Sequence, residues 1–90
     1  MSLTRRLTIR NARGLHARAS ARFVETVERF DARAMVERDG QCVAGDSIMG
    51  LLMLAAGPGS TIDVTTEGRE AEALMEALEA LVEARFGEDH

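Results

Sequence analysis

Hydrophobic and polar residues alternate in three short stretches of the chain, the pattern of strands that are buried on one face. These stretches are centred on residues 7–9, 34–36 and 62–64. The Asp-Gly pair at 39–40 is a strong signal for a two-residue hairpin turn, so residues 41–44 should return beside the second stretch as another strand. The alternation therefore predicts four strands, of which the middle two form a hairpin.

Hydrophobic residues recur at helical spacing in two longer segments, residues 17–30 and 70–86. In the later segment, leucines share one face and glutamates occupy most of the opposite face. A third segment, residues 48–54, is apolar and follows Ser47, a residue type that commonly caps the start of a helix. We therefore predict three helices, the last of which should end at Gly87.

The predicted order of elements is βαββαβα, without an internal repeat or a linker. This order favours an α+β fold in which helices cover one face of a four-stranded sheet. Ninety residues make one small domain. We expect that domain to span residues 1–90, with its core between about residues 3 and 86 and a short, mobile C-terminal tail. Periodicity alone does not separate this fold from other small split-βαβ domains.

Charge is distributed unevenly along the chain. Residues 1–24 contain six arginines and no acid, whereas nine acids and only two arginines follow from Ser60 onward. A basic face would attract an anionic group or an acidic partner surface; alternatively, these charges are solvated or cancel in the fold. The net charge of −4, with three Phe and no Tyr or Trp, argues against a nucleic-acid partner.

Several classes of protein are disfavoured by what the chain contains. Cys42 is the only cysteine, so it cannot form an intramolecular disulfide, and with two distant histidines it cannot build a zinc site. There is no run of about 18 apolar residues that would span a bilayer and no charged-then-apolar leader. We expect a cytoplasmic protein that has no metal, no cofactor and no membrane partner.

One of the two histidines, His16, lies where the first helix should begin, between Gly14 and Arg18. The start of a helix has unpaired N–H groups and partial positive charge, so it favours anions such as phosphate. An imidazole there can act as a nucleophile toward phosphorus. The alternative is a polar residue that only makes a local hydrogen bond at the helix start.

Residues 14–18 (Gly-Leu-His-Ala-Arg) resemble the active-site signature of HPr, the histidine phosphocarrier family of the bacterial phosphotransferase system. Residues 45–54 are similar to the regulatory-serine segment of the same family, and the two segments occur in the family's order and at about its spacing. The resemblance extends over roughly residues 3–86. It implies an open-faced antiparallel β-sandwich with three helices packed on one side.

The resemblance also implies roles for particular residues. His16 would be phosphorylated on Nδ1, and the Arg18 guanidinium and the backbone N–H groups of Ala17 and Arg18 would hold the phosphate oxygens. A phosphoenolpyruvate-dependent kinase resembling Enzyme I would supply the phosphoryl group and an EIIA-type protein would accept it. The chain would then be a stoichiometric carrier and not an enzyme, serving sugar uptake or the nitrogen-regulatory branch (NPr).

The chain departs from the family pattern at Ala19, where proline is usual. Proline suits the first turn of a helix, because it fixes φ and removes an N–H that has no helical partner there. Alanine is a good helix former, so the helix should persist with a looser first turn. We therefore expect the substitution to affect transfer rate and partner choice, and not whether His16 is phosphorylated.

Ser47 has two interpretations. It can be a helix cap and nothing more, or, as the resemblance implies, it can be phosphorylated by an HPr kinase/phosphorylase, which would change the surface next to His16. This leaves an alternative function, a regulatory interaction module of the same fold that is switched at Ser47 and in which His16 is vestigial. A small ligand-binding domain unrelated to phosphotransfer would leave both motifs as coincidence.

The helix after Ser47 is apolar on almost every side. A short surface helix cannot bury all its side chains against one sheet, so we expect Met49, Leu52 and Met53 to remain exposed as a docking patch. The alternative is a helix buried under the neighbouring loop. We expect a monomer, because the protein would have to dock transiently with successive partners.

Overall fold

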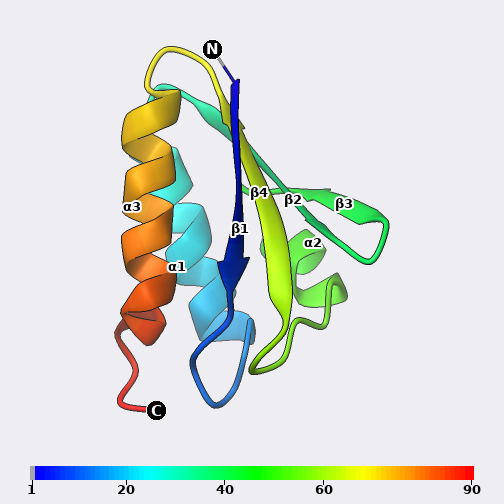
Figure 1. Cartoon of the computed structure of the whole chain (residues 1–90). Helices are drawn as coiled ribbons and strands as arrows, with labels where there is room; N and C mark the ends of the chain where they lie inside the picture. The colour runs from blue at the N-terminus through cyan, green and yellow to red at the C-terminus, as the bar shows by residue number, and fades with distance from the viewer. Residues whose placement is uncertain (1) are drawn as a thin grey trace.

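Four strands form one antiparallel sheet in the computed structural model, which describes residues 2–90 (Figure 1). Across the sheet the strands lie in the order β1 (Ser2–Thr8), β4 (Thr61–Glu67), β2 (Arg33–Arg38) and β3 (Gln41–Ala44). The helices are α1 (Ala17–Glu28), α2 (Ile48–Met53) and α3 (Ala71–Glu83), followed by a short 3-10 turn, η1 (Arg85–Gly87). The predicted order of elements and the α+β class are confirmed.

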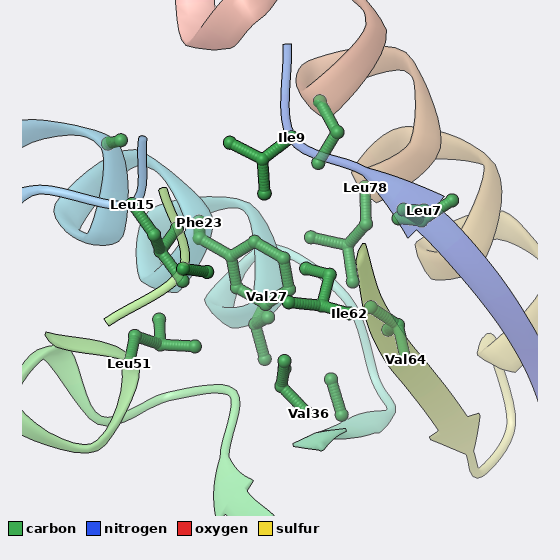
Figure 2. Close-up of a cluster of buried hydrophobic side chains, with 14 of the residues drawn as sticks. Leu7, Ile9, Leu15, Phe23, Val27, Val36, Leu51, Ile62, Val64 and Leu78 are labelled. Carbon is green, nitrogen blue, oxygen red and sulfur yellow. The ribbon is translucent and has the colours of Figure 1, made fainter. Parts of the chain in front are cut away.

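All three helices lie on one side of the sheet, which leaves the other face open (Figure 1). The covered face carries the apolar residues of the alternating stretches, and the register pairs Leu7 with Ile62 and Val36 with Val64 on it. Phe23 of α1 is fully buried and lies at the centre of this cluster (Figure 2). Removal of this apolar surface from water is the main force that holds the helices on the sheet.

The first strand begins and ends earlier than the alternation predicts. Ile9 lies beyond the end of β1, yet it is fully buried. Its N–H donates to the Ser60 carbonyl at 2.9 Å, and its carbonyl accepts from the Gly59 N–H at 2.8 Å. Backbone bonds to the loop before β4 thus hold Ile9 in the core after regular pairing has ended.

The prediction that the last helix reaches Phe86 is wrong, because α3 ends at Glu83. Arg85, Phe86 and Gly87 all have positive φ, at 57°, 56° and 80°. This sharp turn buries Phe86 completely in the core, so the gain from burying an aromatic ring outweighs continuation of the helix. The chain after Phe86 is thereby redirected to the loop between β1 and α1 (Figure 1).

None of the helices in residues 2–90 is long and apolar enough to cross a lipid bilayer.

Candidate functional site

His16 is the N-cap of α1. Its backbone is extended (φ −78°, ψ −176°), and its Nδ1 accepts a hydrogen bond from the Arg18 backbone N–H at 3.3 Å. The His16 carbonyl accepts from the Ser20 N–H at 2.8 Å and so begins the helical ladder. The predicted position of the histidine at the start of the helix is confirmed. The local hydrogen bond considered as an alternative is present too, and it uses the nitrogen that the family resemblance assigns to phosphorylation.

The loop that carries His16 is fixed against the loop before β4. Leu15 donates its N–H to the Ala56 carbonyl at 2.9 Å. Gly14 has φ +66°, and a Cβ there would lie 2.8 Å from the Gly57 Cα, so no larger residue fits. Glycine therefore permits a backbone contact that sets the direction in which His16 leaves the loop.

The other ring nitrogen of His16 contacts the C-terminal tail. Its Nε2 lies 2.5 Å from Glu88 Oε2, and both side chains are only 16% exposed. The tail is also joined to the loop through its backbone, because the Ala12 N–H donates to the His90 carbonyl at 2.9 Å. The tail expected to be mobile thus lies against the site in this structure, and its mobility in solution stays a prediction.

Asn11 connects the tail to the loop from inside. Its side chain is fully buried, and its Nδ2 donates to the Gly14 carbonyl at 2.7 Å and to Glu88 Oε1 at 3.0 Å. Its Oδ1 has no partner in the described part of the chain. Because flipping the amide would place that oxygen against two acceptors, the two donated bonds fix its orientation. Glu88 therefore accepts hydrogen bonds with both of its carboxylate oxygens.

The pKa of Glu88 reflects this environment. Burial raises the pKa of the carboxyl, but hydrogen bonds from Asn11 and His16, together with the charges of His16 and Arg13, lower it by more. The pKa of Glu88 therefore lies below its ordinary value, and the carboxylate form is favoured beside the imidazole. The tail consequently presents a negative charge to Nε2.

The six early arginines divide into three groups. Arg5, Arg6 and Arg10 pair with Glu79, Asp63 and Glu83. Arg22 donates to the Phe86 carbonyl at 2.7 Å and so supports the turn before the tail. Arg13 and Arg18, both exposed and both next to His16 in the sequence, form no ion pair within residues 2–90. Half of the predicted basic face is thus neutralised, and the unpaired positive charge flanks His16.

A pocket of about 380 Å³ opens beside the imidazole. It is formed by the loop, the first turns of α1 and the tail, with the lining residues Ala12, Arg13, His16, Arg18, Arg22, Gly87, Glu88, Asp89 and His90. The arginines on the loop and α1 side of this pocket attract an anion, whereas the carboxylates of Glu88 and Asp89 lie on its tail side. No group of three or more His, Cys, Asp or Glu side chains in residues 2–90 is arranged to hold a metal ion.

The Ser47 corner is a second helix start. Ser47 is half-buried, and its Oγ accepts from the Gly50 backbone N–H at 3.0 Å, so the predicted cap is confirmed. Met49 and Met53 are 69% and 64% exposed, as the sequence predicts. Leu52, however, is only half-exposed, because it lies beside His16 and the loop residues 55–57 in a shallow depression. That depression reaches from Leu52 on α2 to His16.

Sequence reasoning missed Asn11, Arg13 and Glu88 as parts of the site. Arg13 was counted with the basic face and Asn11 with the loop, but neither had a signal of its own. For Glu88 a signal was available, since Phe86-Gly87 directly after an apolar helix is typical of a helix end that folds back on the core. The residues that the resemblance assigned to the cradle, Ala17 and Arg18, do lie at the first two positions of α1.

Comparison with known proteins gives consistent matches. Residues 3–84 match the family model described as the PTS HPr component phosphorylation site. The phosphocarrier protein HPr of Cupriavidus necator is 46% identical over 86 residues, which cover 96% of this chain and 97% of the relative. The phosphocarrier protein NPr of Shewanella violacea is 40% identical over 86 residues, or 96% and 94% of the two chains.

Solved structures agree with the sequence matches. The crystal structure of HPr-C-His from Thermoanaerobacter tengcongensis is similar to this fold with a TM-score of 0.90 and 37% identity, and the match covers 100% of this chain and 99% of that one.

Proposed function

This chain belongs to the HPr family of the phosphotransferase system, and we propose on that basis that it carries a phosphoryl group on Nδ1 of His16. The observation that supports this most strongly is the electrostatic environment of the imidazole. It stands at the start of α1 between Arg13 and Arg18, two arginines without a carboxylate partner in the described chain. A structural cap alone would not require unpaired cations on both sides.

The proposed transfer needs only groups that are already in place. The lone pair of Nδ1 attacks phosphorus, and the bond from phosphorus to the donor breaks with its electron pair leaving on the donor. The Arg18 N–H, which now bonds to Nδ1 at 3.3 Å, becomes free for a phosphoryl oxygen, and the Ala17 N–H at the helix start is a second donor. The Arg18 guanidinium offers a planar, permanently charged fork to the same oxygens. Positioning and charge stabilisation of this kind are most of what phosphoryl transfer asks of a protein.

The proposed partners are a phosphoenolpyruvate-dependent kinase of the Enzyme I type and an acceptor of the EIIA type. We assign their docking to the exposed Met49 and Met53, with Leu52 at the edge nearest His16. Methionine side chains are flexible and polarizable, which suits a surface that must meet more than one partner. Because HPr and NPr relatives both match over nearly the full chain, the sugar and nitrogen branches both remain candidates.

A second function, a regulatory interaction module switched by a kinase at Ser47, is favoured by the same exposed methionines. A phosphate on Ser47 would lie at the start of α2, where the fold tolerates negative charge. The surroundings of His16 argue against the interaction module as the main function, because a vestigial histidine would not need Arg13, Arg18 and Glu88 around it.

The experiment that tests the proposal uses purified protein, phosphoenolpyruvate and an Enzyme I. Intact mass and the acid lability of any added phosphate are measured for the wild type, His16→Ala and Ser47→Ala. We expect one acid-labile phosphate on the wild type and on Ser47→Ala, and none on His16→Ala. Failure of the wild type to accept phosphate from a cognate Enzyme I would contradict the proposal and favour the interaction module.

A further inference from the structure

The two hydrogen bonds of the His16 ring determine where its proton lies. A backbone N–H can only donate, so the Arg18 N–H at 3.3 Å requires a lone pair on Nδ1. A neutral imidazole with a lone pair on Nδ1 carries its hydrogen on Nε2. Nε2 faces Glu88 Oε2 at 2.5 Å, and a carboxylate can only accept. Both contacts therefore favour the same tautomer.

Glu88 is itself held in place by groups that do not take part in the transfer. The buried amide of Asn11 donates to its other carboxylate oxygen at 3.0 Å. The turn that delivers it is fixed by the fully buried Phe86 ring and by the bond from Arg22 to the Phe86 carbonyl. Gly87 has φ +80°, a backbone conformation that residues with a Cβ rarely adopt. The carboxylate thus has a defined position on the side of the ring opposite Nδ1.

We propose that Glu88 is a positioning residue for His16: its carboxylate accepts the Nε2–H, holds the ring in one orientation and leaves the lone pair on Nδ1. This inference rests on the proposed function for the reaction itself. It assigns to the C-terminal tail a part in the site that the family resemblance did not imply.

The proposed contact also matches the charge that develops during transfer. When Nδ1 bonds to phosphorus and the donor leaves with its electron pair, the His16 ring keeps the hydrogen on Nε2 and takes on imidazolium character. Glu88 then faces a developing positive charge with a carboxylate at hydrogen-bond distance. No proton has to leave His16. The contact should therefore be stronger in the transition state and product than in the resting protein, which is the condition for raising kcat.

The test compares Glu88→Ala, Glu88→Gln and Gly87→Ala with the wild type in steady-state transfer from a phosphorylated Enzyme I. Removing the carboxylate should lower kcat roughly tenfold and leave KM unchanged, since a charge-assisted hydrogen bond is lost but no docking surface is. Glu88→Gln keeps an oxygen that can accept the Nε2–H and should restore part of the rate. Gly87→Ala keeps the carboxylate but displaces it, so it should behave like Glu88→Ala. Glu76→Gln, an exposed glutamate of α3, is the matched control.

A second readout does not depend on transfer. Ring ¹⁵N chemical shifts of His16 are measured in the unphosphorylated protein. We expect the wild type to show one tautomer with hydrogen on Nε2, and Glu88→Ala to show a mixture of both.

The inference is overturned if Glu88→Ala keeps either the wild-type kcat or the wild-type ring spectrum. If the wild type accepts no phosphate at all, the proposed function fails, while the ring spectra still decide whether Glu88 positions the imidazole. If the wild type is phosphorylated and the ring spectra of wild type and Glu88→Ala agree, only the inference about Glu88 fails.

Discussion

The helix starts at His16 and Ser47 share the same side-chain N-cap but differ in the groups that surround it. At each, a side-chain acceptor receives a backbone N–H from the first turn, at 3.3 Å from Arg18 and at 3.0 Å from Gly50. At Ser47 this bond is sufficient to explain the role of the residue in the fold, because no charged side chain contacts the hydroxyl within residues 2–90. His16 has further contacts that a cap does not need. A carboxylate lies at its second ring nitrogen, and arginines without an ion pair lie on either side of it in the sequence.

The difference shows how a site can be separated from a structural motif. A cap requires one acceptor and an extended backbone, and both residues supply these. The buried Asn11 amide donates to the Gly14 carbonyl, which supports the loop, and also to Glu88, a bond that neither the loop nor the cap requires. The contacts that a helix cap does not require, those of Glu88, Arg13 and Arg18, are therefore the ones that indicate a functional site at His16.

The largest effect that would sharpen this comparison is expected at Arg18. Arg18→Ala should lower the rate of phosphoryl transfer roughly 10- to 100-fold, because a charge-assisted bond to the phosphoryl oxygens is lost. The transfer rate of Arg18→Lys should lie between those of the wild type and Arg18→Ala, since lysine keeps the charge but not the planar fork. Rapid-quench measurement of label on His16 gives the rates. A wild-type rate for Arg18→Ala would contradict the assigned role, and Arg29→Ala, at the C-cap of α1, controls for loss of charge.

The Ser47 corner should affect docking and not chemistry. Replacing both Met49 and Met53 with serine should raise KM for the Enzyme I-type kinase roughly tenfold, because exposed apolar anchors are lost, and should leave kcat unchanged. Steady-state transfer assays measure both constants. Met35→Ser, an exposed methionine on β2, is the matched control. A fall in kcat without a change in KM would contradict the assignment of docking to α2 and of chemistry to His16.

Stability should respond to the cap of α2 and only weakly to a phosphate-like charge there. Ser47→Ala should lower the free energy of unfolding by about 1 kcal/mol, because the Gly50 N–H loses its acceptor. Ser47→Asp should cost less than about 0.5 kcal/mol, since aspartate is an equally good N-cap. Urea denaturation of the two variants gives the comparison. Equal losses in both would mean that the hydroxyl does more than cap the helix.

The smallest expected effect is a pH dependence confined to the His16 corner. The folded-state pKa of Glu88 is lowered, so its contribution to stability is present above the ordinary pKa and is lost as pH falls through the folded value. The hydroxyl cap at Ser47 does not titrate in this range. The free energy of unfolding should therefore fall more steeply below the ordinary pKa of glutamate for the wild type than for Glu88→Gln. Parallel pH curves would show that the hydrogen bonds from Asn11 and His16 and the charges of His16 and Arg13 do not favour the Glu88 carboxylate.

Local patterns predicted most of the fold because they repeat within single elements. The Asp39-Gly40 hairpin, the β3 strand and the Ser47 cap lie where sequence placed them. The end of α3 was not predicted, because burial of Phe86 is a contact with distant parts of the core that helical periodicity does not record. The extension of β1 back to Ser2 follows from backbone pairing with Glu67, which side-chain alternation does not encode.

The candidate site was predicted where its residues are adjacent in the sequence. Residues 14–18 carry both the motif and the helix start. Glu88 lies 72 residues from His16 along the chain, and its contact depends on the turn at 85–87 that periodicity missed. The partial burial of Leu52 was missed for a related reason, since its neighbours come from another loop.

The central claim, that the capping nitrogen of His16 is the phosphoryl acceptor, is tested most directly by NMR of the ¹⁵N-labelled protein after reaction with phosphorylated Enzyme I. The account predicts ³¹P coupling to Nδ1 of His16, an amide shift of Arg18 as its N–H leaves that nitrogen, and no change at Gly50. Phosphate on Nε2, on Ser47 or on neither residue would contradict it.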